Sequence, residues 1–335
     1  MHILITGSAG FVGSNLAERL VRQGHYVTGV DCFTDYYARE IKERNLEDLS
    51  GHERFRLVEA DLAEVDLVSL LRHGSPVPDH SPRQNSGGAP QTPMDYVFHL
   101  AAQPGVRGSW GRNFETYTRN NILVTQRLLE AAKEVPLKKL VYTSSSSIYG
   151  DAESFPTPED LTPRPISPYG VTKLAAEQLC LLYWRNYGIP VACTRLFTVY
   201  GPRQRPDMAF NKFIRAMQNE DEVPIYGDGE QTRDFTFVGD AIDAIESAAF
   251  SDTRGEVFNV GGGSRVTVNR VLDILGEILG RTARRKYVTP QNGDARDTAA
   301  DIRKASQRLG YQPHVTLEQG LRWQVAWAQQ YTTAR

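Results

Sequence analysis

The stretch HILITGSAGFVGSNLAERL (residues 2–20) joins an apolar run to a helical pattern through a turn with glycines at positions 7, 10 and 13. The apolar run has the composition of a buried strand, and Leu16 and Leu20 then repeat with the period of a helix. Glycines between a strand and a helix let the backbone turn tightly and bring a pyrophosphate to the amides of the helix N-terminus. An ordinary tight turn is the alternative. We predict a dinucleotide-binding turn formed by Gly7, Gly10, Phe11, Val12 and Gly13.

Further short apolar runs alternate with helical patterns along the chain, which is typical of a doubly wound parallel sheet. We predict strands at 2–6, 26–30, 55–60, 95–100, 139–144, 190–195 and 256–260, and helices at 13–23, 113–134 and 168–187. After about residue 200 the helices shorten and Gly and Pro become frequent. The fold class is therefore α/β, with a Rossmann-type sheet and a smaller C-terminal α/β lobe for a substrate. We expect residues 1–200 to form the cofactor domain and 201–335 mainly the second lobe, with some later segments returning to the first.

Residues 74–93 (GSPVPDHSPRQNSGGAPQTP) interrupt this pattern. They are rich in Pro, Gly, Ser and Gln and contain almost no apolar side chains, so they cannot bury a core of their own. We predict a mobile surface insertion.

The overall composition excludes several classes of protein. A formal net charge of −2 with both signs interspersed offers no footprint for nucleic acid. No apolar run reaches the roughly 18 residues of a membrane span, and residues 2–6 lack the features of a signal peptide, so we expect a cytoplasmic protein without a membrane partner. Cys32, Cys180 and Cys193 form no C-x-x-C pair and are interpreted as reduced packing residues. The histidines show no metal-ligand spacing, and we expect no metal.

Two acidic residues follow predicted strands where a dinucleotide would lie. Asp31 closes the second strand, 18 residues beyond Gly13, and a carboxylate there accepts hydrogen bonds from ribose hydroxyls and repels a 2′-phosphate. We therefore predict NAD rather than NADP, although Arg39 or Lys42 nearby would act in the opposite direction. Asp61 ends the third strand and is a candidate for the adenine amino group, with a helix N-cap as the alternative.

Tyr169 and Lys173 lie four residues apart on a predicted helix and share one face. Ser144, Ser145, Ser146 and Ser147 follow a strand end, where sheet enzymes expose their chemistry. A tyrosine titrates near pH 10 and must lose about three units to act as a base at neutral pH. One nearby cation typically supplies 1–3 units, so Lys173 together with a positively charged nicotinamide would suffice. A Y-x-x-x-K pattern alone is weak, but with the serines and the glycine turn it indicates catalysis.

These segments resemble the extended short-chain dehydrogenase/reductases that modify nucleotide sugars. The resemblance covers nearly the whole chain outside 74–93 and includes TGSAGFVGS, HLAAQ, SSSSIYG, SPYGVTK, RLFTVYGPRQRPDM, GDGEQTRDF and GDARDTAADIRKA. It implies that Ser145, four residues before Tyr149, joins Tyr169 and Lys173 in a catalytic triad with Tyr169 as the base. It also implies that the cofactor site includes Asp61, Leu62, Leu100, Ala101, Ala102 and Asn121, together with Tyr169 and Lys173.

Within that family, the later step of the reaction separates the enzymes. The dehydratases carry an Asp-Glu pair just after the catalytic Ser or Thr, and the decarboxylases usually carry a glutamate at the second of these positions. Here the two positions are Ser146 and Ser147. Elimination and decarboxylation lose support, and return of the hydride to the opposite face of a rotated keto-sugar remains.

The nearest resemblance is to the UDP-glucuronate 4-epimerases, through SSSSIYG, GDARDTAADI and Thr198 where UDP-galactose epimerases usually have asparagine. It implies a UDP-sugar substrate. Hydroxyl groups would hold the sugar carboxylate, Arg205 would orient it, and Arg233 and Arg296 would clamp the diphosphate. The implied substrate-binding residues are Ser145, Ser146, Ser147, Thr198, Arg205, Met208, Phe210, Tyr226, Arg233 and Arg296.

Several alternatives stay open from the sequence. Solvated loops or surface ion pairs are alternatives for the arginines, and Met208 and Phe210 have the pattern of helix core first and of a uracil wall second. A 4-epimerase of neutral UDP-hexoses is the nearest rival function, a UDP-glucuronate decarboxylase is a weaker one, and a non-catalytic dinucleotide sensor is a rival of another class. The helices at 113–134 and 168–187 pair across subunits in related enzymes, which implies a homodimer.

Overall fold

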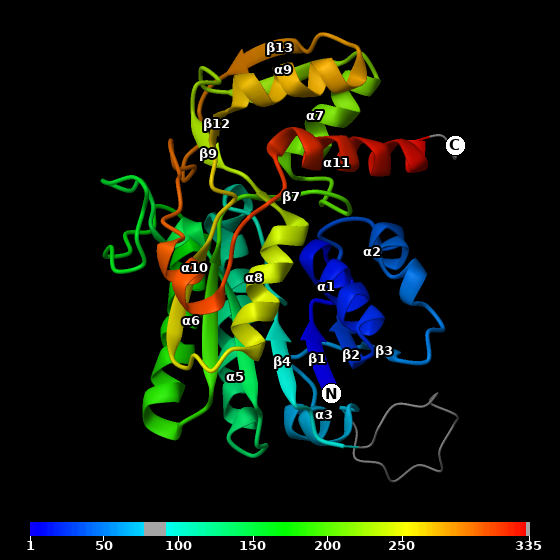
Figure 1. Cartoon of the computed structure of the whole chain (residues 1–335), viewed down its shortest axis with the longest axis vertical. Helices are drawn as coiled ribbons and strands as arrows, with labels where there is room; N and C mark the ends of the chain where they lie inside the picture. Colours follow the sequence, from blue (N-terminus) through cyan, green and yellow to red (C-terminus); the bar gives the residue numbers. More distant parts are fainter. Residues whose placement is uncertain (77–91, 333–335) are drawn as a thin grey trace.

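A central parallel sheet of seven strands organises the computed structural model, which describes residues 1–76 and 92–332 (Figure 1). The strand order is β11-β6-β5-β4-β1-β2-β3, and every neighbouring pair is parallel. The strands are β1 (His2–Thr6), β2 (Tyr26–Asp31), β3 (Phe55–Glu59), β4 (Tyr96–His99), β5 (Lys139–Ser145), β6 (Val191–Leu196) and β11 (Glu256–Val260). The predicted α/β fold with a Rossmann-type sheet is confirmed, and all seven predicted strands are present.

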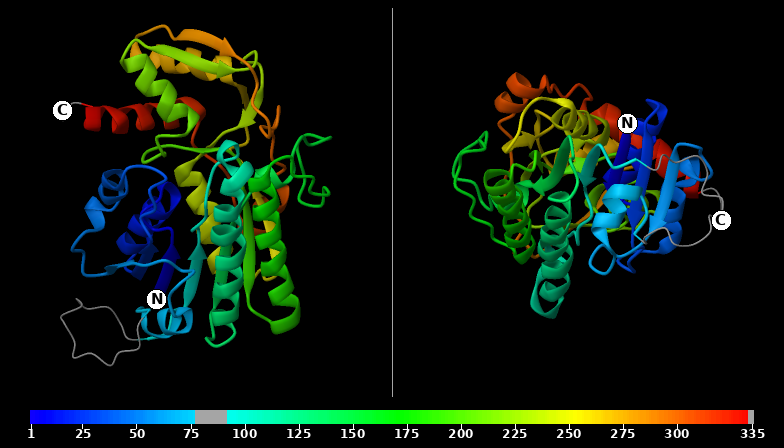
Figure 2. Two further views of the ribbon diagram at one scale, coloured as in Figure 1. Left: turned by 180° about the vertical axis from the view of Figure 1, so that it is seen from behind. Right: turned by 90° about the horizontal axis from the view of Figure 1, so that it is seen from below.

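Helices cover both faces of this sheet because the strands are apolar on both sides. Ile3 and Ile5 of β1 pack in a core with α1 (Phe11–Arg22) and α8 (Val238–Phe250). Leu4, between them, packs in a second core with α3 (Leu67–His73), α5 (Val124–Ala132) and α6 (Pro168–Tyr187). Figure 2 shows α5 and α6 running side by side along the sheet. Residues of alternating orientation on one strand thus build two cores, as a doubly wound sheet requires.

The predicted helix at 168–187 is confirmed with the same bounds, and its glycine cap explains its end. Ser167 accepts a hydrogen bond from the Gly170 amide at the start, and Gly188 adopts a left-handed conformation at the end. The predicted helix at 113–134 is instead built from three segments: α4 (Phe114–Tyr117), a π-helix, η4 (Thr118–Leu123), and α5. A π-helical turn holds more residues than an α-turn, and it is frequent at functional sites.

The strand at 256–260 does not belong to the second lobe, although the sequence pattern changes long before it. β11 pairs with β6 at the edge of the main sheet, and α8 packs against β5 and β6. Local periodicity identifies a strand but carries no information about which sheet it joins.

A second group of elements lies beyond the carboxyl ends of the main strands (Figure 1). It includes α7 (Ala209–Gln218), α9 (Val268–Leu279) and α11 (Leu317–Thr332), with β8 (Glu222–Tyr226) parallel to β13 (Arg284–Val288). These elements share a core that contains Phe213, Ile225, Leu272 and Leu321. Two further ladders join β7 (Val199–Tyr200) to β10 (Thr236–Phe237) and β9 (Thr232–Asp234) to β12 (Arg265–Thr267).

The remaining helices are short and lie in the connections: α2 (Arg39–Asn45), α10 (Arg303–Leu309), η1 (Glu47–Leu49), η2 (Arg107–Ser109), η3 (Gly111–Asn113) and η5 (Ser146–Ile148). The insertion predicted at 74–93 falls mostly on residues 77–91, outside the described residues. Across 1–76 and 92–332, no helix combines the length and apolarity that crossing a membrane requires.

Candidate active site

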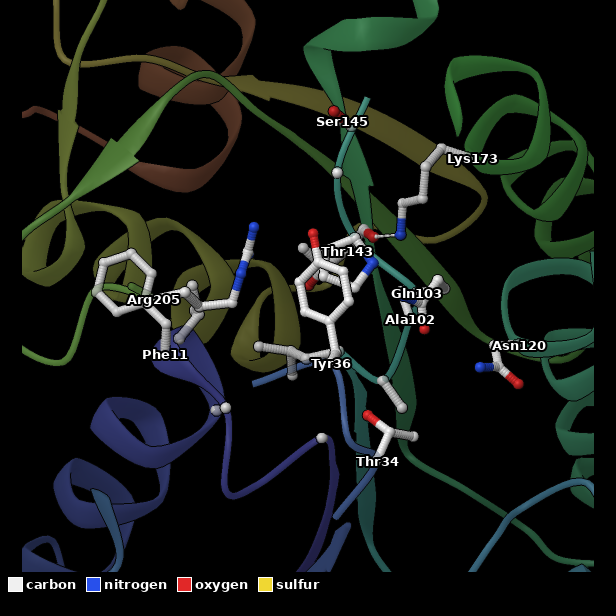
Figure 3. Close-up of a pocket in the computed structure, with 18 of the residues that line it drawn as sticks. Phe11, Thr34, Tyr36, Ala102, Gln103, Asn120, Thr143, Ser145, Lys173 and Arg205 are labelled. Carbon is white, nitrogen blue, oxygen red and sulfur yellow. Dashed lines mark hydrogen bonds between the residues drawn. The ribbon is translucent and has the colours of Figure 1, made fainter. Parts of the chain in front are cut away.

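A large cavity lies over the carboxyl ends of the main strands, between the sheet and the segment that follows β6 (Figure 3). In parallel sheets this edge is where ligands bind. Its walls come from the turn after β1, the ends of β2 and β5, the segments after β3 and β4, and the start of α6. Most of the residues predicted for the site line it: Gly7, Gly10, Phe11, Val12, Gly13, Asp31, Asp61, Leu62, Leu100, Ala101, Ala102, Ser145, Ser146, Ser147, Tyr169, Lys173, Thr198, Arg205 and Met208.

The glycine turn has the geometry of a cradle. Gly7 adopts a φ of +73°, and a Cβ there would lie 2.9 Å from the backbone nitrogen of Ala101. A Cβ at Gly13 would lie 2.1 Å from the carbonyl oxygen of Gly7, so only glycine lets α1 begin so close to β1. Gly10 caps α1 without any side-chain hydrogen bond. The first amides of α1 are therefore available to an anion, as a pyrophosphate requires.

Asp31 is oriented toward this turn by its neighbours. One carboxylate oxygen accepts from the Ala9 amide at 3.2 Å, and the other accepts from the Phe33 amide at 2.9 Å and from Lys42 Nζ at 3.1 Å. Lys42, one of the two cations expected to act against NAD, is thus paired with Asp31. Arg39, the other, pairs with Glu59 at 2.7 Å on the surface. The chemistry of the site, an acidic group beside open helix amides, fits the adenosine and pyrophosphate of NAD.

Asp61 lines the cavity, but its carboxylate already has partners. One oxygen accepts from the Ala63 amide at 2.8 Å and the other pairs with Arg119 Nη1 at 2.8 Å. The helix N-cap considered as an alternative is Asp66 instead, which accepts from the first amides of α3. The cysteines also divide: Cys180 and Cys193 are buried, whereas Cys32 is exposed and lines the cavity. The interpretation of Cys32 as a packing residue is wrong, because the strand ends one residue before it.

Asn121 supports the wall of the cavity rather than lining it. Its Oδ1 accepts from the Gln103 amide at 2.6 Å, and its Nδ2 donates to Gln103 O at 3.1 Å and to Thr172 Oγ1 at 2.9 Å. Asn120 lines the cavity instead (Figure 3). Adjacent residues of a helix point in different directions, so only one of these two asparagines faces the cavity, and the partners of Asn121 on other elements decide that it is Asn120.

The predicted catalytic residues meet at the end of β5. Ser145 lies beside Tyr169 and acts to lower the pKa of its hydroxyl. The Lys173 ammonium donates to the carbonyl oxygen of Thr143 (Figure 3). Ser145 Oγ also accepts from the Ser147 amide at 3.1 Å, which orients the hydroxyl. Helical spacing puts Tyr169 and Lys173 on the face of α6 that packs on β5.

Burial dominates the electrostatics of this group. It raises the pKa of Tyr169, while the hydrogen bond from Ser145 and the charge of Arg205 act to lower it. Burial also lowers the pKa of Lys173 to about 8. The sequence argument named Lys173 and a nicotinamide as the groups that lower the pKa of Tyr169. In the structure the cation whose charge lowers the pKa of Tyr169 is Arg205, whereas Lys173 donates to the Thr143 carbonyl oxygen and is not among the groups that shift this pKa.

Two profiles of known protein families match this chain. The profile of the NAD dependent epimerase/dehydratase family matches residues 87–261, and that of the GDP-mannose 4,6 dehydratases matches residues 4–76. The chain belongs to the NAD-dependent epimerase/dehydratase family. The resemblance to extended short-chain dehydrogenase/reductases is thereby confirmed.

Relatives within the epimerase/dehydratase family cover the whole length of the chain. A UDP-glucuronic acid 4-epimerase from Bacillus cereus, solved with UDP-glucuronic acid and NAD, superimposes with a TM-score of 0.90 and 41% identity over 99% of this chain and 100% of that one. A UDP-glucuronate 4-epimerase of Thermodesulfobacterium geofontis is 36% identical over 98% of this chain and 96% of its own. An uncharacterized UDP-glucose epimerase of Bacillus subtilis is 40% identical over 98% of each chain.

Four residues predicted to bind the UDP-sugar do not line the cavity. Phe210 is buried in the core of the second lobe, so the core interpretation holds for it. Arg107 stacks over the Tyr226 ring at 3.9 Å. Arg233 Nη1 donates to the carbonyl oxygen of Arg296 at 2.7 Å, and Arg296 Nη2 pairs with Asp228 at 3.0 Å. The two arginines are therefore adjacent, and Arg296 carries a carboxylate partner whose place a diphosphate would take.

The sequence did not indicate that several further residues line the cavity. They include Thr34, Tyr36 and Tyr37 after β2, Gln103, Pro104, Gly105 and Val106 after β4, and Asn120. The 103–106 loop directly follows HLAA, and a glycine at 105 with a φ of +98° marks its turn. Asp207, which hydrogen-bonds Arg205, was also missed. The only signal for it was an arginine and an aspartate two positions apart.

One arrangement of possible metal ligands lies away from this cavity. Asp240, Asp243 and His314 bring ligand atoms within 4.8 Å of one another, although no sequence spacing indicated it. Asp243 is already ion-paired with Arg19. Arg19 thus already supplies a positive charge beside the possible metal ligands.

Proposed function

We propose that this protein is an NAD-dependent 4-epimerase that interconverts UDP-glucuronate and UDP-galacturonate. The observation that carries the proposal is the joint position of Ser145, Tyr169 and Lys173 in one cavity with the glycine turn and with Ser146, Ser147 and Thr198. The relatives named UDP-glucuronate 4-epimerases, which match over nearly the whole chain, support the same substrate.

In this mechanism Tyr169 accepts the proton of the sugar C4 hydroxyl, with Ser145 beside the phenol and Lys173 one helical turn away. The glycine turn and Asp31 would hold NAD, which would supply the acceptor and then the donor of the C4 hydride. Ser146 and Ser147 provide neither the acid nor the base that loss of water requires. The 4-keto-uronate is a β-keto acid. Hydroxyl groups of the protein hold its carboxylate, and positions 146 and 147 carry no acidic side chain that could act as a base.

We propose that residues 1–200, with β11 and α8, carry the cofactor and that most of 201–335 binds the sugar nucleotide. Tyr226, Arg233 and Arg296 lie on β8, on β9 and in the segment that runs beside β9. Guanidinium groups suit diphosphate oxygens, and these two are neighbours through the Arg233 to Arg296 hydrogen bond. Closure of these residues on UDP would exchange their present partners for the diphosphate.

Purified protein incubated separately with UDP-glucuronate and UDP-glucose, without added cofactor, tests the function. We expect chromatography to resolve UDP-galacturonate from the first substrate. Conversion of UDP-glucose alone would establish the neutral-hexose epimerase, and release of a UDP-pentose would establish the decarboxylase.

Asp31 gives a prediction about the cofactor. Asp31→Ser removes a charged acceptor of ribose hydroxyl hydrogen bonds, each worth about 1.5–3 kcal/mol. We expect NAD to bind roughly 10- to 100-fold more weakly. The preference for NAD over NADP should narrow, since Lys42 loses its partner. Calorimetric titration of the apoprotein with both dinucleotides measures this, with exposed Asp35→Ser as the control. An unchanged preference would remove Asp31 from the recognition of ribose.

We also propose a homodimer formed through α5 and α6. Exposed apolar side chains gather on this helical layer: Phe114, Leu123, Val171, Leu182 and Tyr187. Helices that present such side chains to water usually pack against a partner. A cytoplasmic location is proposed as well, because Cys32, Cys180 and Cys193 are free thiols, which reducing compartments preserve.

A charged side chain introduced on α6 at the proposed interface tests the dimer. Leu182, which is 51% exposed on α6, is replaced by glutamate. We expect the variant to elute and scatter light as a monomer, because a buried unpaired carboxylate is costly. Leu57→Glu, on the edge strand β3 at the far side of the sheet, is the matched control and should keep the wild-type mass. A wild-type monomer, or a dimeric Leu182 variant, would contradict the proposal.

A further inference from the structure

The guanidinium of Arg205 is held by a carboxylate of the protein itself. Arg205 Nε donates to Asp207 Oδ1 at 2.9 Å, and Nη2 donates to Asp207 Oδ2 at 3.0 Å. This is the two-pronged geometry with which an arginine would grip a substrate carboxylate. Arg205 lines the cavity together with Ser145, Ser146 and Thr198. The side chain expected to clamp the uronate therefore already has a carboxylate in its fork.

Tyr36 holds Asp207 from the cofactor side of the cavity. Its hydroxyl donates to Asp207 Oδ2 at 3.2 Å, and its ring lies 5.9 Å from the Arg205 guanidinium (Figure 3). A Cβ at Gly105 would lie 2.6 Å from the Tyr36 hydroxyl, so the phenol is also packed against the loop after β4. Asp207 thus has three donor groups from two side chains, one of them in the connection after β2.

Asp207 carries a full negative charge in this arrangement. Burial acts to raise its pKa, but the hydrogen bond and ion pair with Arg205 hold that pKa below its ordinary value. Burial likewise acts to lower the pKa of Arg205, and Asp207 raises it. The pair is therefore ionised and close to neutral as a unit, and a second carboxylate nearby would meet repulsion from Asp207 as well as attraction to Arg205.

Epimerisation sets a condition on how firmly the carboxylate is held. The keto-sugar must release its carboxylate, turn, and bind again with the other face toward the hydride donor. A charge-assisted, two-pronged bond to arginine would hold the intermediate in one orientation. Single hydrogen bonds from hydroxyl groups lack both the ion-pair attraction and the two-pronged geometry of an arginine, so they are exchanged more readily. Binding that is equally strong in the substrate and in the transition state lowers KM without raising kcat.

We propose that Asp207, held by Tyr36, is a specificity-determining residue that masks Arg205, so that the uronate carboxylate is bound by hydroxyl groups and is released during each turnover. This rests on the proposed UDP-glucuronate 4-epimerase function. It assigns to Asp207 a role that the serines and Thr198 cannot fill, because they carry no charge with which to compensate Arg205.

The test is Asp207→Asn, which keeps the shape of the side chain and removes its charge. We expect Arg205 to gain the substrate carboxylate as its partner. UDP-glucuronate should then bind about tenfold more tightly by calorimetry, which corresponds to about 1.4 kcal/mol. In the same variant kcat should fall by at least that factor, and reduced nicotinamide should accumulate during turnover. Binding of UDP-glucose, which has no carboxylate, should not change.

Two further variants control for indirect effects. Tyr36→Phe leaves the charge of Asp207 in place and removes one of its hydrogen-bond donors. As in Asp207→Asn, UDP-glucuronate should bind more tightly and kcat should fall, but each by a smaller factor. Arg205→Met combined with Asp207→Asn removes the charge that is unmasked, and the tight binding should disappear. Thermal unfolding of each variant reports whether it is folded.

Weaker binding of UDP-glucuronate by folded Asp207→Asn protein, or a fall in kcat without any gain in binding, would overturn the masking role. Failure of the proposed function is a separate result: wild-type protein would then leave UDP-glucuronate unconverted. If the wild type makes UDP-galacturonate while Asp207→Asn binds its substrate more weakly, only the masking role fails.

Discussion

Replacing Tyr169 with phenylalanine is expected to lower kcat for UDP-glucuronate by about 10²–10⁴, the usual contribution of a positioned acid or base. The variant loses only the hydroxyl whose pKa Ser145 acts to lower. The ring, which packs edge-on against Tyr117 at 6.2 Å, keeps its place. Turnover is measured by chromatography of the sugar nucleotides, and NAD binding by titration should stay close to that of the wild type.

Tyr187→Phe, at the far end of the same helix and exposed, is the matched control and should retain full activity. A Tyr169→Phe protein with more than about a tenth of the wild-type kcat would contradict the mechanism, since it would place the base elsewhere. A wild-type protein that turned over none of the tested sugars would instead favour the interpretation of this chain as a dinucleotide sensor.

Replacing Glu177 with glutamine is expected to lower the free energy of unfolding by about 3–5 kcal/mol, the usual cost of leaving a buried charge without its partner. Glu177 is 0% exposed and Arg195 is 4% exposed. Arg195 Nε donates to Glu177 Oε2 at 3.0 Å, and Nη2 donates to Oε1 at 2.7 Å. Arg195 also donates to the Tyr149 hydroxyl and to the carbonyl oxygen of Glu159. Denaturant unfolding followed by circular dichroism measures the loss.

Glu177→Gln should also disturb the placement of Tyr169 and Lys173, because Glu177 follows them at four-residue spacing on α6. A double variant, Glu177→Met with Arg195→Met, removes both charges and should recover much of the stability. If Glu177→Gln unfolds at the same denaturant concentration as the wild type, the ion pair does not hold α6 on the sheet. Glu153→Gln, in an exposed pair with Arg164, is a control that should change stability little.

Local sequence was sufficient for most of the fold and for the centre of the site. The seven strands and α6 follow from apolar periodicity, since a strand or helix buries the side chains that its own period brings to one face. The glycine turn follows from conformation: Gly7 has a positive φ, and a side chain at Gly13 would collide with the preceding turn. Tyr169 and Lys173 follow from helical spacing. None of these inferences needs a contact between distant parts of the chain.

The errors arose where distant segments meet. β11 is a strand by composition, but its place beside β6 depends on how the chain returns from the second lobe. Asn121 was placed in the cavity, but its side chain bonds Gln103 and Thr172, which lie on other elements, and Asn120 lines the cavity. The hydrogen bond that joins Arg233 to Arg296 likewise connects segments 63 residues apart, while their role at the diphosphate stays a prediction.

The sequence by itself determined the Rossmann-type sheet and the glycine turn and predicted the helical pair Tyr169 and Lys173, because each rests on residues close together in the chain or on the order of strands; Ser145 was added by the family resemblance. Only the tertiary structure decided which charges compensate one another. Tyr36 and Asp207 are 171 residues apart and meet across the cavity. Their distance in sequence leaves no periodic signal, and the electrostatic environment of Arg205 exists only once the connection after β2 and the segment after β6 have packed together.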